Sequence, residues 1–433
     1  DLAARKLKEI LNSSGDKSLA GFGCAKGSNE EAYLFQKLIR TGFKNNNVDH
    51  CTRMCHASSV AALMETIGSG AVTAPVSEIQ NADVAIVIGA RPTQNHPVAA
   101  TFIKNAVKKN GLKLIIMDPR KQDLSRISEK SLQFTPGADV ALLNAMINTI
   151  IEEGLVDRQY IEKNTEGYKD LKEHIKDFTP EEMSDICGIS ASEIRETARL
   201  FANAKSAMIF WGMGISQHIH GTDNSRCLIS LAMITGNIGR KGTGLHPLRG
   251  QNNVQGASDV GLIPMVFPDY QPISDSKNLK FFENYWHTKL DPNPGLTVVE
   301  IMESIYNKSI KGLYVMGENP AMSDPNANHA REALARLEIL IVQDIFLTET
   351  AYLADIVLPA SAFPEKTGTF TNTDRRVQLA KKAVNPPGKA KQDLWIIQEL
   401  AKRMGLNWNY NGPDEVYDEL SKCMESMKNI TWE

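Results

Sequence analysis

The amino-acid sequence predicts an α/β protein with mostly parallel sheets. Apolar, β-branched runs alternate with segments whose apolar residues recur at helical spacing, a pattern typical of βαβ units. Small or polar residues follow at the points where these runs stop. With 433 residues, 42% of them hydrophobic and 23% charged, the chain is long enough for two or three domains of this kind.

Six short apolar runs are predicted to be strands because they are rich in β-branched residues. They are Ser18–Gly23, Asp83–Gly89, Leu112–Asp118, Ala207–Gly212, Gly312–Gly317 and Leu337–Asp344.

Helix starts are indicated at three places between these runs. Ser28, Thr179 and Ser190 each stand three residues before a glutamate, which is the spacing of a capping box. Pro180 suits the first position of the second helix. Buried helix faces are predicted by the apolar stripes Ile194, Ala198 and Phe201, and Val140, Leu143, Ile147 and Ile150.

The segment Pro264–Pro294 is rich in proline and polar residues. This composition predicts a surface excursion and not a part of the core.

Composition argues against several classes of protein. The net charge of −3 is too small for a nucleic-acid-binding surface, and no apolar run is long enough to span a membrane. Six cysteines in so long a chain do not suggest a disulfide framework, which indicates a reducing, cytoplasmic location. A removed export signal is the alternative, because the chain begins at Asp1 without a leader.

The cysteines are also too few and too scattered for an iron–sulfur cluster. A [4Fe–4S] cluster needs about four cysteines at close spacing, and the only close pair is Cys51 and Cys55. A zinc site at that pair would lack its remaining ligands. For the other positions the simpler interpretation is a small buried side chain: Cys24, Cys51, Cys187, Cys227 and Cys423.

Two segments carry residues suited to redox chemistry. Cys55 offers a thiolate, which is a soft metal ligand, and His56 offers a proton acceptor with a pKa near neutrality. Far along the chain, Arg249 opens a segment of amides and glycines that ends at Gly256, where one cation can hold a small anion against the backbone. Together the two segments predict a metal-centred redox site for a small carboxylate.

Polar residues follow five of the predicted strands, where ligands of open α/β sheets bind. Because these strand ends fall in two stretches of the chain, they predict two nucleotide-like groups; for any single loop, ordinary turn chemistry is the alternative. No glycine cluster completes a dinucleotide fingerprint, and no phosphate-binding lysine loop or Gly-x-Ser-x-Gly elbow occurs. A plain NAD enzyme and an acyl transferase are therefore disfavoured.

With these residues the chain resembles the catalytic subunit of molybdenum- or tungsten-dependent formate dehydrogenases, of the dimethyl-sulfoxide-reductase superfamily. The resemblance runs through nearly all of the chain, and the Arg249 segment is its most specific part. A histidine directly after the metal cysteine points to formate rather than nitrate. The motifs that carry the resemblance are Cys51–His56, Asp118–Lys121, Trp211–Gln217, Arg249–Gly261, Met316–Pro320 and Gln343–Phe346.

The resemblance implies an active site made by Cys55 as the metal ligand, with His56 and Arg249 beside it. Two molybdopterin guanine dinucleotides are expected to supply the dithiolene sulfurs that complete the coordination of molybdenum or tungsten. The residues that match the cofactor-binding regions are Gly89, Asp118, Arg120, Gly137, Asp139, Met213, Gly214, Gln217, Gln251, Gly317, Glu318, Asn319, Gln343, Asp344, Thr348 and Asp355.

The resemblance also implies two doubly wound, Rossmann-like domains, one inserted in the other. Residues 1–50 with 252–365 are expected to form the first domain and 51–251 the second. Residues 366–433 are expected to pack on the first domain or on segments outside this chain. The family's [4Fe–4S] segment and C-terminal β-barrel domain are expected to be absent, so little activity is expected from these residues alone.

The activity implied is the two-electron oxidation of formate to carbon dioxide, or the reverse. Arg249 would hold the carboxylate, and His56 would accept a proton or orient the substrate. Electrons would pass to electron-transfer subunits or iron–sulfur proteins, with no nucleic acid and no membrane span involved. The alternatives are another molybdopterin oxidoreductase, such as a nitrate reductase, and a cofactor-free subunit of a redox complex.

Overall fold

The computed structural model describes all 433 residues, which divide into two compact units. Unit 1 comprises Asp1–Met54, Gln251–Asn372 and Arg376–Glu433, and unit 2 comprises Cys55–Gly250 and Thr373–Arg375. Most of the C-terminal tail belongs to unit 1. None of the helices combines the length and the apolarity that crossing a membrane requires.

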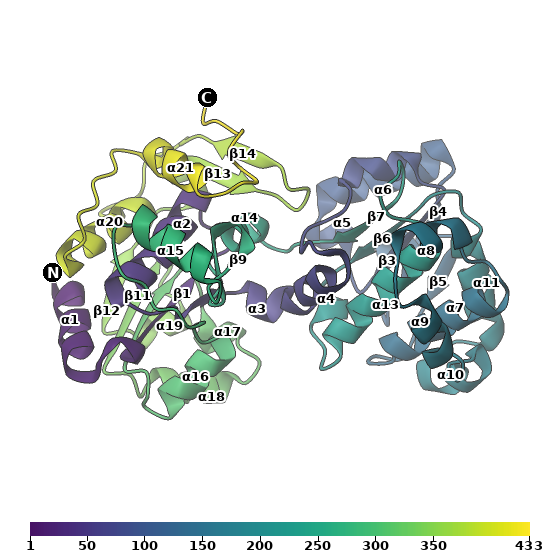
Figure 1. Cartoon of the computed structure of the whole chain (residues 1–433), viewed down its shortest axis with the longest axis horizontal. Helices are drawn as coiled ribbons and strands as arrows, with labels where there is room; N and C mark the ends of the chain where they lie inside the picture. Colours follow the sequence, from purple (N-terminus) through teal and green to yellow (C-terminus); the bar gives the residue numbers. More distant parts are fainter. The chain divides into compact units, whose positions relative to one another are not determined.

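Unit 1 is built on a parallel sheet with the order β12-β11-β10-β1-β2 (Figure 1). Alternate residues of β10, the central strand, face opposite sides of the sheet. Tyr314 and Met316 point into one core, and Leu313 and Val315 point into the other. The strands are β1 (Leu19–Gly23), β2 (Val48–His50), β10 (Gly312–Met316), β11 (Ile339–Asp344) and β12 (Ile356–Pro359).

Helices cover both faces of this sheet. The first face packs under α1 (Leu2–Ser14), α2 (Asn29–Leu38), α14 (Val254–Asp259), α15 (Ser276–Tyr285), α20 (Asp393–Met404) and α21 (Pro413–Lys422). The second packs under α16 (Val298–Tyr306), α17 (Pro320–Ser323), α18 (Ala327–Leu334) and α19 (Glu349–Tyr352). Two short antiparallel pairs complete the unit: β8 (Val266–Phe267) with β9 (Gln271–Pro272), and β13 (Gly368–Thr371) with β14 (Val377–Ala380).

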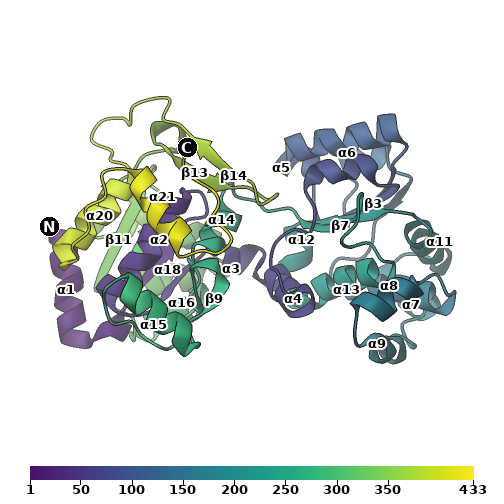
Figure 2. The ribbon, with the colours of Figure 1, turned by 45° about the horizontal axis from the view of Figure 1, so that its top comes forward.

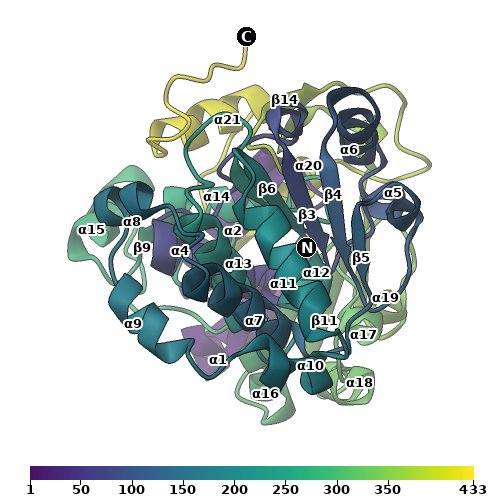
Figure 3. The same cartoon turned by 90° about the vertical axis from the view of Figure 1, so that its right-hand side faces the viewer.

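Unit 2 repeats this plan with the strand order β5-β4-β3-β6-β7, again all parallel. Figure 3 shows β6, β3, β4 and β5 side by side in that order. The strands are β3 (Val84–Ile88), β4 (Lys113–Met117), β5 (Lys130–Leu132), β6 (Ala207–Trp211) and β7 (Gly244–Pro247).

Here too the helices form two layers, and Figure 2 shows α6 on one side of the sheet and α13 and α7 on the other. The α6 core contains Val87 and Phe210, whereas their strand neighbours Ile86 and Ile209 join the opposite core. The α6 layer consists of α5 (Pro92–Asn95) and α6 (Pro97–Asn110). The other layer consists of α4 (Ala57–Ile67), α7 (Asp139–Glu152), α8 (Arg158–Asn164), α9 (Tyr168–His174), α10 (Pro180–Cys187), α11 (Ala191–Ala202), α12 (Met213–Ser216) and α13 (Gly221–Ile234).

The fold class predicted from the sequence is therefore confirmed: both units are doubly wound, mostly parallel sheets. All six predicted strands form, each shortened by one or two residues at its ends. The strands that the sequence did not reveal are β2, β5, β7 and β12, together with the two short pairs. β2, β5 and β7 are short edge strands without an apolar run of their own, and β12 is an apolar edge strand of only four residues. The strands of the two short pairs are two to four residues long.

The predicted helix starts are confirmed by their hydrogen bonds. The Ser28 side chain accepts from the amide of Glu31, whose carboxylate accepts from the amide of Ser28 at 2.8 Å, so this capping box is complete. Thr179 and Ser190 accept from the third amide of their helices in the same way.

The prediction for Pro264–Pro294 was wrong, because this segment enters the core. Phe267 and Phe282 are fully buried and stack with ring centroids 4.5 Å apart, with Trp286 beside them. The buried guanidinium of Arg40 donates to the carbonyls of Gly261, Ile263 and Val266, so the loop that opens the segment has its polar groups satisfied. Burial of three aromatic side chains stabilises this segment in the core in spite of its prolines.

Candidate functional site

The order of strands in unit 1 reverses between β1 and β10. The chain runs from β1 outward to β2 on one side, and from β10 outward to β11 and β12 on the other. Open α/β sheets bind ligands beyond the carboxyl ends of the strands at such a switch point. The loops there are Cys24–Gly27 after β1 and Gly317–Asn319 after β10.

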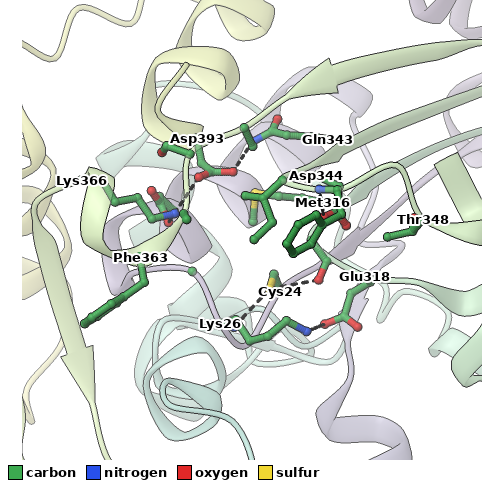
Figure 4. Close-up of a pocket in the computed structure, with 18 of the residues that line it drawn as sticks. Cys24, Lys26, Met316, Glu318, Gln343, Asp344, Thr348, Phe363, Lys366 and Asp393 are labelled. Atoms are coloured by element: carbon green, nitrogen blue, oxygen red, sulfur yellow. Dashed lines mark hydrogen bonds and ion pairs between the residues drawn. The ribbon is translucent and has the colours of Figure 1, made fainter. Parts of the chain in front are cut away.

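A cavity of about 660 Å³ lies at this switch point (Figure 4). Its volume falls in the range of sites for small molecules and cofactors. Six residues predicted to bind the cofactor line it: Gly317, Glu318, Asn319, Gln343, Asp344 and Thr348.

The cavity also exposes residues that the sequence analysis assigned otherwise or passed over. Cys24 lines it, so the interpretation of this side chain as plain core was incomplete. Its thiol donates to the carbonyl of Gly317 at 3.3 Å and accepts from the amide of Lys26 at 3.1 Å, while burial raises the pKa of the thiol to about 12. The signal that could have found it is its place directly after a predicted strand.

One wall of the cavity carries a charged pair. Nζ of Lys26 lies 3.9 Å from the buried Oε1 of Glu318, and Figure 4 shows the two side chains pointing toward one another. Burial raises the pKa of Glu318 to about 7, although Lys26 opposes the shift. A group that titrates near neutrality can accept a hydrogen bond from a ligand or donate one to it.

A second wall holds a buried ion network. Nζ of Lys366 lies 2.8 Å from Glu31 and 2.6 Å from Asp393. Asp393 in turn accepts from Nε2 of Gln343 at 2.7 Å, and the hydroxyl of Tyr314 donates to the Gln343 oxygen. Both the oxygen and the nitrogen of the Gln343 amide are therefore hydrogen-bonded within the protein, and the side chain forms part of the cavity wall. Lys366 and Asp393 were missed because they lie far along the chain from the strand ends.

The switch point of unit 2 lies between β3 and β6, where two glycine loops cross in close contact. The amide of Gly214 donates to the carbonyl of Gly89 at 3.0 Å. A Cβ built on Gly89 would lie 2.8 Å from the carbonyl carbon of Gly214, and one on Gly212 would lie 2.8 Å from the oxygen of Gly89. Only glycine permits this close approach of the two backbones. Met213 and Gln217 are exposed on the same loop.

The other predicted residues of unit 2 follow neighbouring strands. Asp118, after β4, accepts from the amide of Arg120 at 2.8 Å and from Gln122 at 3.2 Å, so its carboxylate shapes the loop. Gly137, with φ of 87°, leads into α7, where Asp139 occupies the first turn. Burial raises the pKa of Asp139, against the influence of His218.

Two residues predicted to bind the cofactor, Asp355 and Gln251, do not line the cavity. Asp355 precedes β12, and its carboxylate accepts from the amide of Leu340 at 2.8 Å. It therefore lies at the amino ends of the strands, at the opposite edge of the sheet from the cavity. Gln251 opens the second part of unit 1 beside Asn252, which lines the cavity.

Cys55, His56 and Arg249 all belong to unit 2 and are buried, with 5%, 0% and 4% of their surface exposed. Burial raises the pKa of the Cys55 thiol, whereas the charge of Arg249 and a hydrogen bond with the Gly250 backbone lower it. The carbonyl of Cys55 accepts from Oγ of Ser216 at 2.6 Å, which fixes this turn of backbone. The structure thus brings a thiol close to a buried cation.

The imidazole of His56 has one nitrogen committed and one available. Nε2 lies 3.0 Å from the carbonyl of Leu248, which can only accept, so Nε2 carries the proton. Nδ1 is buried without a hydrogen-bond partner and keeps its lone pair. Burial, with the charge of Arg249, lowers the pKa of His56 to about 3.

The guanidinium of Arg249 is anchored at one corner, where Nη2 donates to the carbonyl of Gly70 at 2.6 Å. This anchor keeps a fixed cation beside the Cys55 thiol. No cluster of three or more His, Cys, Asp or Glu side chains is placed to hold a metal ion, so a metal at Cys55 would draw its other ligands from a cofactor. The three residues can provide a soft ligand, an anion-binding group and a proton acceptor.

Comparison with known proteins gives a consistent set of relatives. The family model for molybdopterin oxidoreductases matches residues 1–403. The F420-dependent formate dehydrogenase alpha subunit of Methanocaldococcus jannaschii is 49% identical over 413 residues, covering 95% of this chain and 61% of the relative. Formate dehydrogenase H of Escherichia coli is 41% identical, with 99% of this chain and 60% of the relative covered. The chain therefore spans less than two thirds of the length of these relatives.

The fold has a solved counterpart. Acetylene hydratase from Pelobacter acetylenicus superposes with a TM-score of 0.79 at 23% identity, covering 100% of this chain and 61% of that one.

Proposed function

Because this chain belongs to the molybdopterin oxidoreductase family, we propose that it forms the catalytic core of a formate dehydrogenase. The reaction is the oxidation of formate to carbon dioxide, one proton and two electrons, or its reverse. The observation that carries this proposal is the buried Cys55 thiol under the influence of the Arg249 charge. Relatives named formate dehydrogenases at 41–49% identity support the choice of substrate.

The residues present fit a molybdenum or tungsten centre held by pterin dithiolenes. Burial raises the pKa of the Cys55 thiol, and the Arg249 charge and a hydrogen bond with the Gly250 backbone offset part of this rise. The thiolate is the form that binds a soft metal. When bound, the centre supplies a two-electron acceptor. Cys55 holds it to the protein.

The remaining residues act on formate itself. The Arg249 guanidinium would bind the carboxylate and orient its C–H bond, since its planar fork matches two oxygens. His56, whose Nδ1 has no hydrogen-bond partner, would orient the substrate or accept a proton through this atom. Burial of all three side chains excludes water and strengthens these interactions.

Each unit would hold one pterin nucleotide, in the guanine dinucleotide form. Support comes from the two switch points, one with the cavity and one with the glycine crossing at Gly89 and Gly214. In the cavity, Asp344 and Glu318 offer carboxylates to the amino and imino groups of a guanine. Release of guanosine monophosphate on mild acid hydrolysis of the holoenzyme tests this assignment.

The test of the function uses the purified holoenzyme with an artificial dye. We expect formate-dependent dye reduction, together with about one molybdenum or tungsten per chain and two pterins. Dye oxidation by nitrate without formate activity would instead indicate another molybdopterin oxidoreductase. Protein that copurifies with neither metal nor pterin would indicate a non-catalytic subunit. Copurifying iron–sulfur proteins would identify the partners to which we assign the electrons.

A further inference from the structure

His96 occupies a rigid junction at the edge of the candidate active site. It stands between α5 and α6, and it is flanked by Pro97 at the first position of α6. Its amide donates to the carbonyl of Pro92 at 2.9 Å, and its carbonyl accepts from Ala100 at 2.9 Å. The backbone of His96 is therefore fixed on both sides, which leaves its ring a narrow range of positions.

The ring of His96 makes a hydrogen bond with the backbone of Arg249. Nε2 lies 2.6 Å from the Arg249 carbonyl oxygen. A carbonyl can only accept, so Nε2 is the donor. Nδ1 of His96 is buried and has no hydrogen-bond partner. Burial lowers the pKa of the ring, so the imidazole is neutral and its hydrogen bond is the one to Arg249.

The peptide group that His96 holds also reaches Cys55. The carbonyl of Arg249 and the amide of Gly250 belong to one planar unit, in which the oxygen and the N–H point in opposite directions. The oxygen is bound by His96, and the Gly250 backbone hydrogen-bonds the Cys55 sulfur. Rotation of this peptide would break both bonds together.

Two hydrogen bonds besides the one to His96 also hold Arg249. Its amide makes a long bond of 3.4 Å to Thr373, and its side chain is anchored at Gly70. The next residue, Gly250, is exposed and has open space where a Cβ would stand, so packing does not restrain it.

We propose that His96 is a positioning residue that fixes the Arg249–Gly250 peptide, and through it the N–H that is directed at the Cys55 sulfur. The proposal rests on the proposed function in so far as Cys55 binds the metal. Hydrogen bonds to a ligating sulfur withdraw electron density and raise the reduction potential of the centre. His96 therefore sets both the place of Arg249 and the potential, without touching substrate.

Two substitutions separate this role from a general one in packing. In H96Q the amide nitrogen of glutamine reaches about as far as Nε2, so the bond to Arg249 is restored. In H96N the shorter side chain stops near the place of Nδ1, and the bond is lost. H174N, on α9 in the same unit, is the matched control because His174 is exposed and its ring lies against Phe178, away from Arg249 in the sequence.

Three measurements on the holoenzyme test the proposal. We expect H96N to lower the midpoint potential of the metal centre, to raise the Michaelis constant for formate about tenfold and to speed amide hydrogen exchange in the peptide that spans Gly250. We expect H96Q to restore all three toward wild type, and H174N to leave them unchanged.

Equal potentials and equal exchange at Gly250 in H96N and wild type would overturn the inference. Equal shifts in H96N and H96Q would also overturn the inference. The effect would then come from the loss of histidine packing and not from the loss of the hydrogen bond. Hydrogen exchange does not depend on turnover. If wild-type protein fails to oxidise formate, the proposed function fails, while the exchange at Gly250 still decides the role of His96.

Discussion

The amide of Gly214 donates to the carbonyl of Gly89 across the switch point of unit 2, at 3.0 Å. The two backbones meet there without any side chain between them, and Gly89 adopts a φ of 55°. This crossing brings the ends of β3 and β6 together and defines the place where we assign one pterin nucleotide.

Replacing Gly89 with alanine should destabilise the protein by about 3 kcal/mol. The added Cβ would clash with the Gly214 backbone, and alanine would have to adopt the left-handed backbone conformation of Gly89. Urea unfolding measures the change. Gly154→Ala is the control, since Gly154 has φ of 70° and nothing within 4 Å of a Cβ. We expect that variant to lose only about 1 kcal/mol. Equal losses in the two variants would show that the crossing adds nothing.

Cys55→Ser should reduce the molybdenum or tungsten content of the purified protein to background, because a hydroxyl is a harder and weaker ligand than a thiolate. Elemental analysis checks this directly, and formate-dependent dye reduction should be abolished. Cys51→Ser, four residues earlier, should retain both metal and activity. A Cys55→Ser protein with full metal content would remove Cys55 from the coordination sphere.

Arg249→Lys should raise the Michaelis constant for formate about 10- to 100-fold, a loss of roughly 1.4–2.7 kcal/mol. Lysine keeps the charge but loses the fork that serves the Gly70 carbonyl and the substrate together. Steady-state kinetics give the constants. Arg195→Lys, at a surface ion pair with Glu181 in the same unit, should leave them unchanged. An unaltered constant in Arg249→Lys would count against carboxylate binding by this residue.

The stability of the protein should depend on pH through Glu30. Burial raises the pKa of this carboxyl from 4.5 to about 7, although the side chain and amide of Thr369 donate to it. The folded state therefore binds a proton more tightly than the unfolded state does. The stability from this group is fully present below pH 4.5 and is lost as the pH rises through 7.

Glu30→Gln mimics the protonated group and should remove this dependence. We expect the variant to match wild type at pH 4.5 and to exceed it by about 3 kcal/mol at pH 8, as a shift of this size implies. Urea unfolding at both pH values provides the comparison. The buried His246, whose pKa is lowered by burial to about 4, affects both proteins alike at low pH. Parallel pH profiles for the two proteins would contradict this assignment.

Lys366→Met should destabilise unit 1 by about 3–5 kcal/mol, because it leaves the carboxylates of Glu31 and Asp393 buried without their cation. It should also weaken retention of the pterin nucleotide, since Lys366 lines the cavity wall. Lys389→Met is the control at an exposed position and should change stability by less than about 0.5 kcal/mol. Similar unfolding midpoints for both variants would mean that the network is dispensable.

Much of the fold follows from local signals. The six apolar strands and the caps at Ser28, Thr179 and Ser190 appear where the sequence predicts them, because strand and cap preferences depend on a few neighbouring residues. The two-part division stays a prediction, beside which the chain separates into two compact units. Prediction failed at Pro264–Pro294, where burial of Phe267 and Phe282 depends on partners elsewhere in the chain.

The candidate site divides in the same way. Cys55, His56 and Arg249 were proposed from their residue types and motifs, since the kind of donor or acceptor that a side chain carries is known from the sequence. Their exposure, the bare Nδ1 of His56 and the contact of His96 with Arg249 were not accessible in this way. A hydrogen bond between positions 96 and 249 has no local signature in either segment.

From its amino-acid sequence alone, this protein could be assigned its α/β class, its strand ends and the three residues to which we propose redox roles, because these depend on local patterning and on side-chain type. Only the tertiary structure decided that Cys24, Lys366 and Asp393 share a cavity wall, and that Asp355 lies at the other end of the sheet. Strand order and the direction of each strand decide which distant loops meet, and they arise from the packing of whole faces against one another.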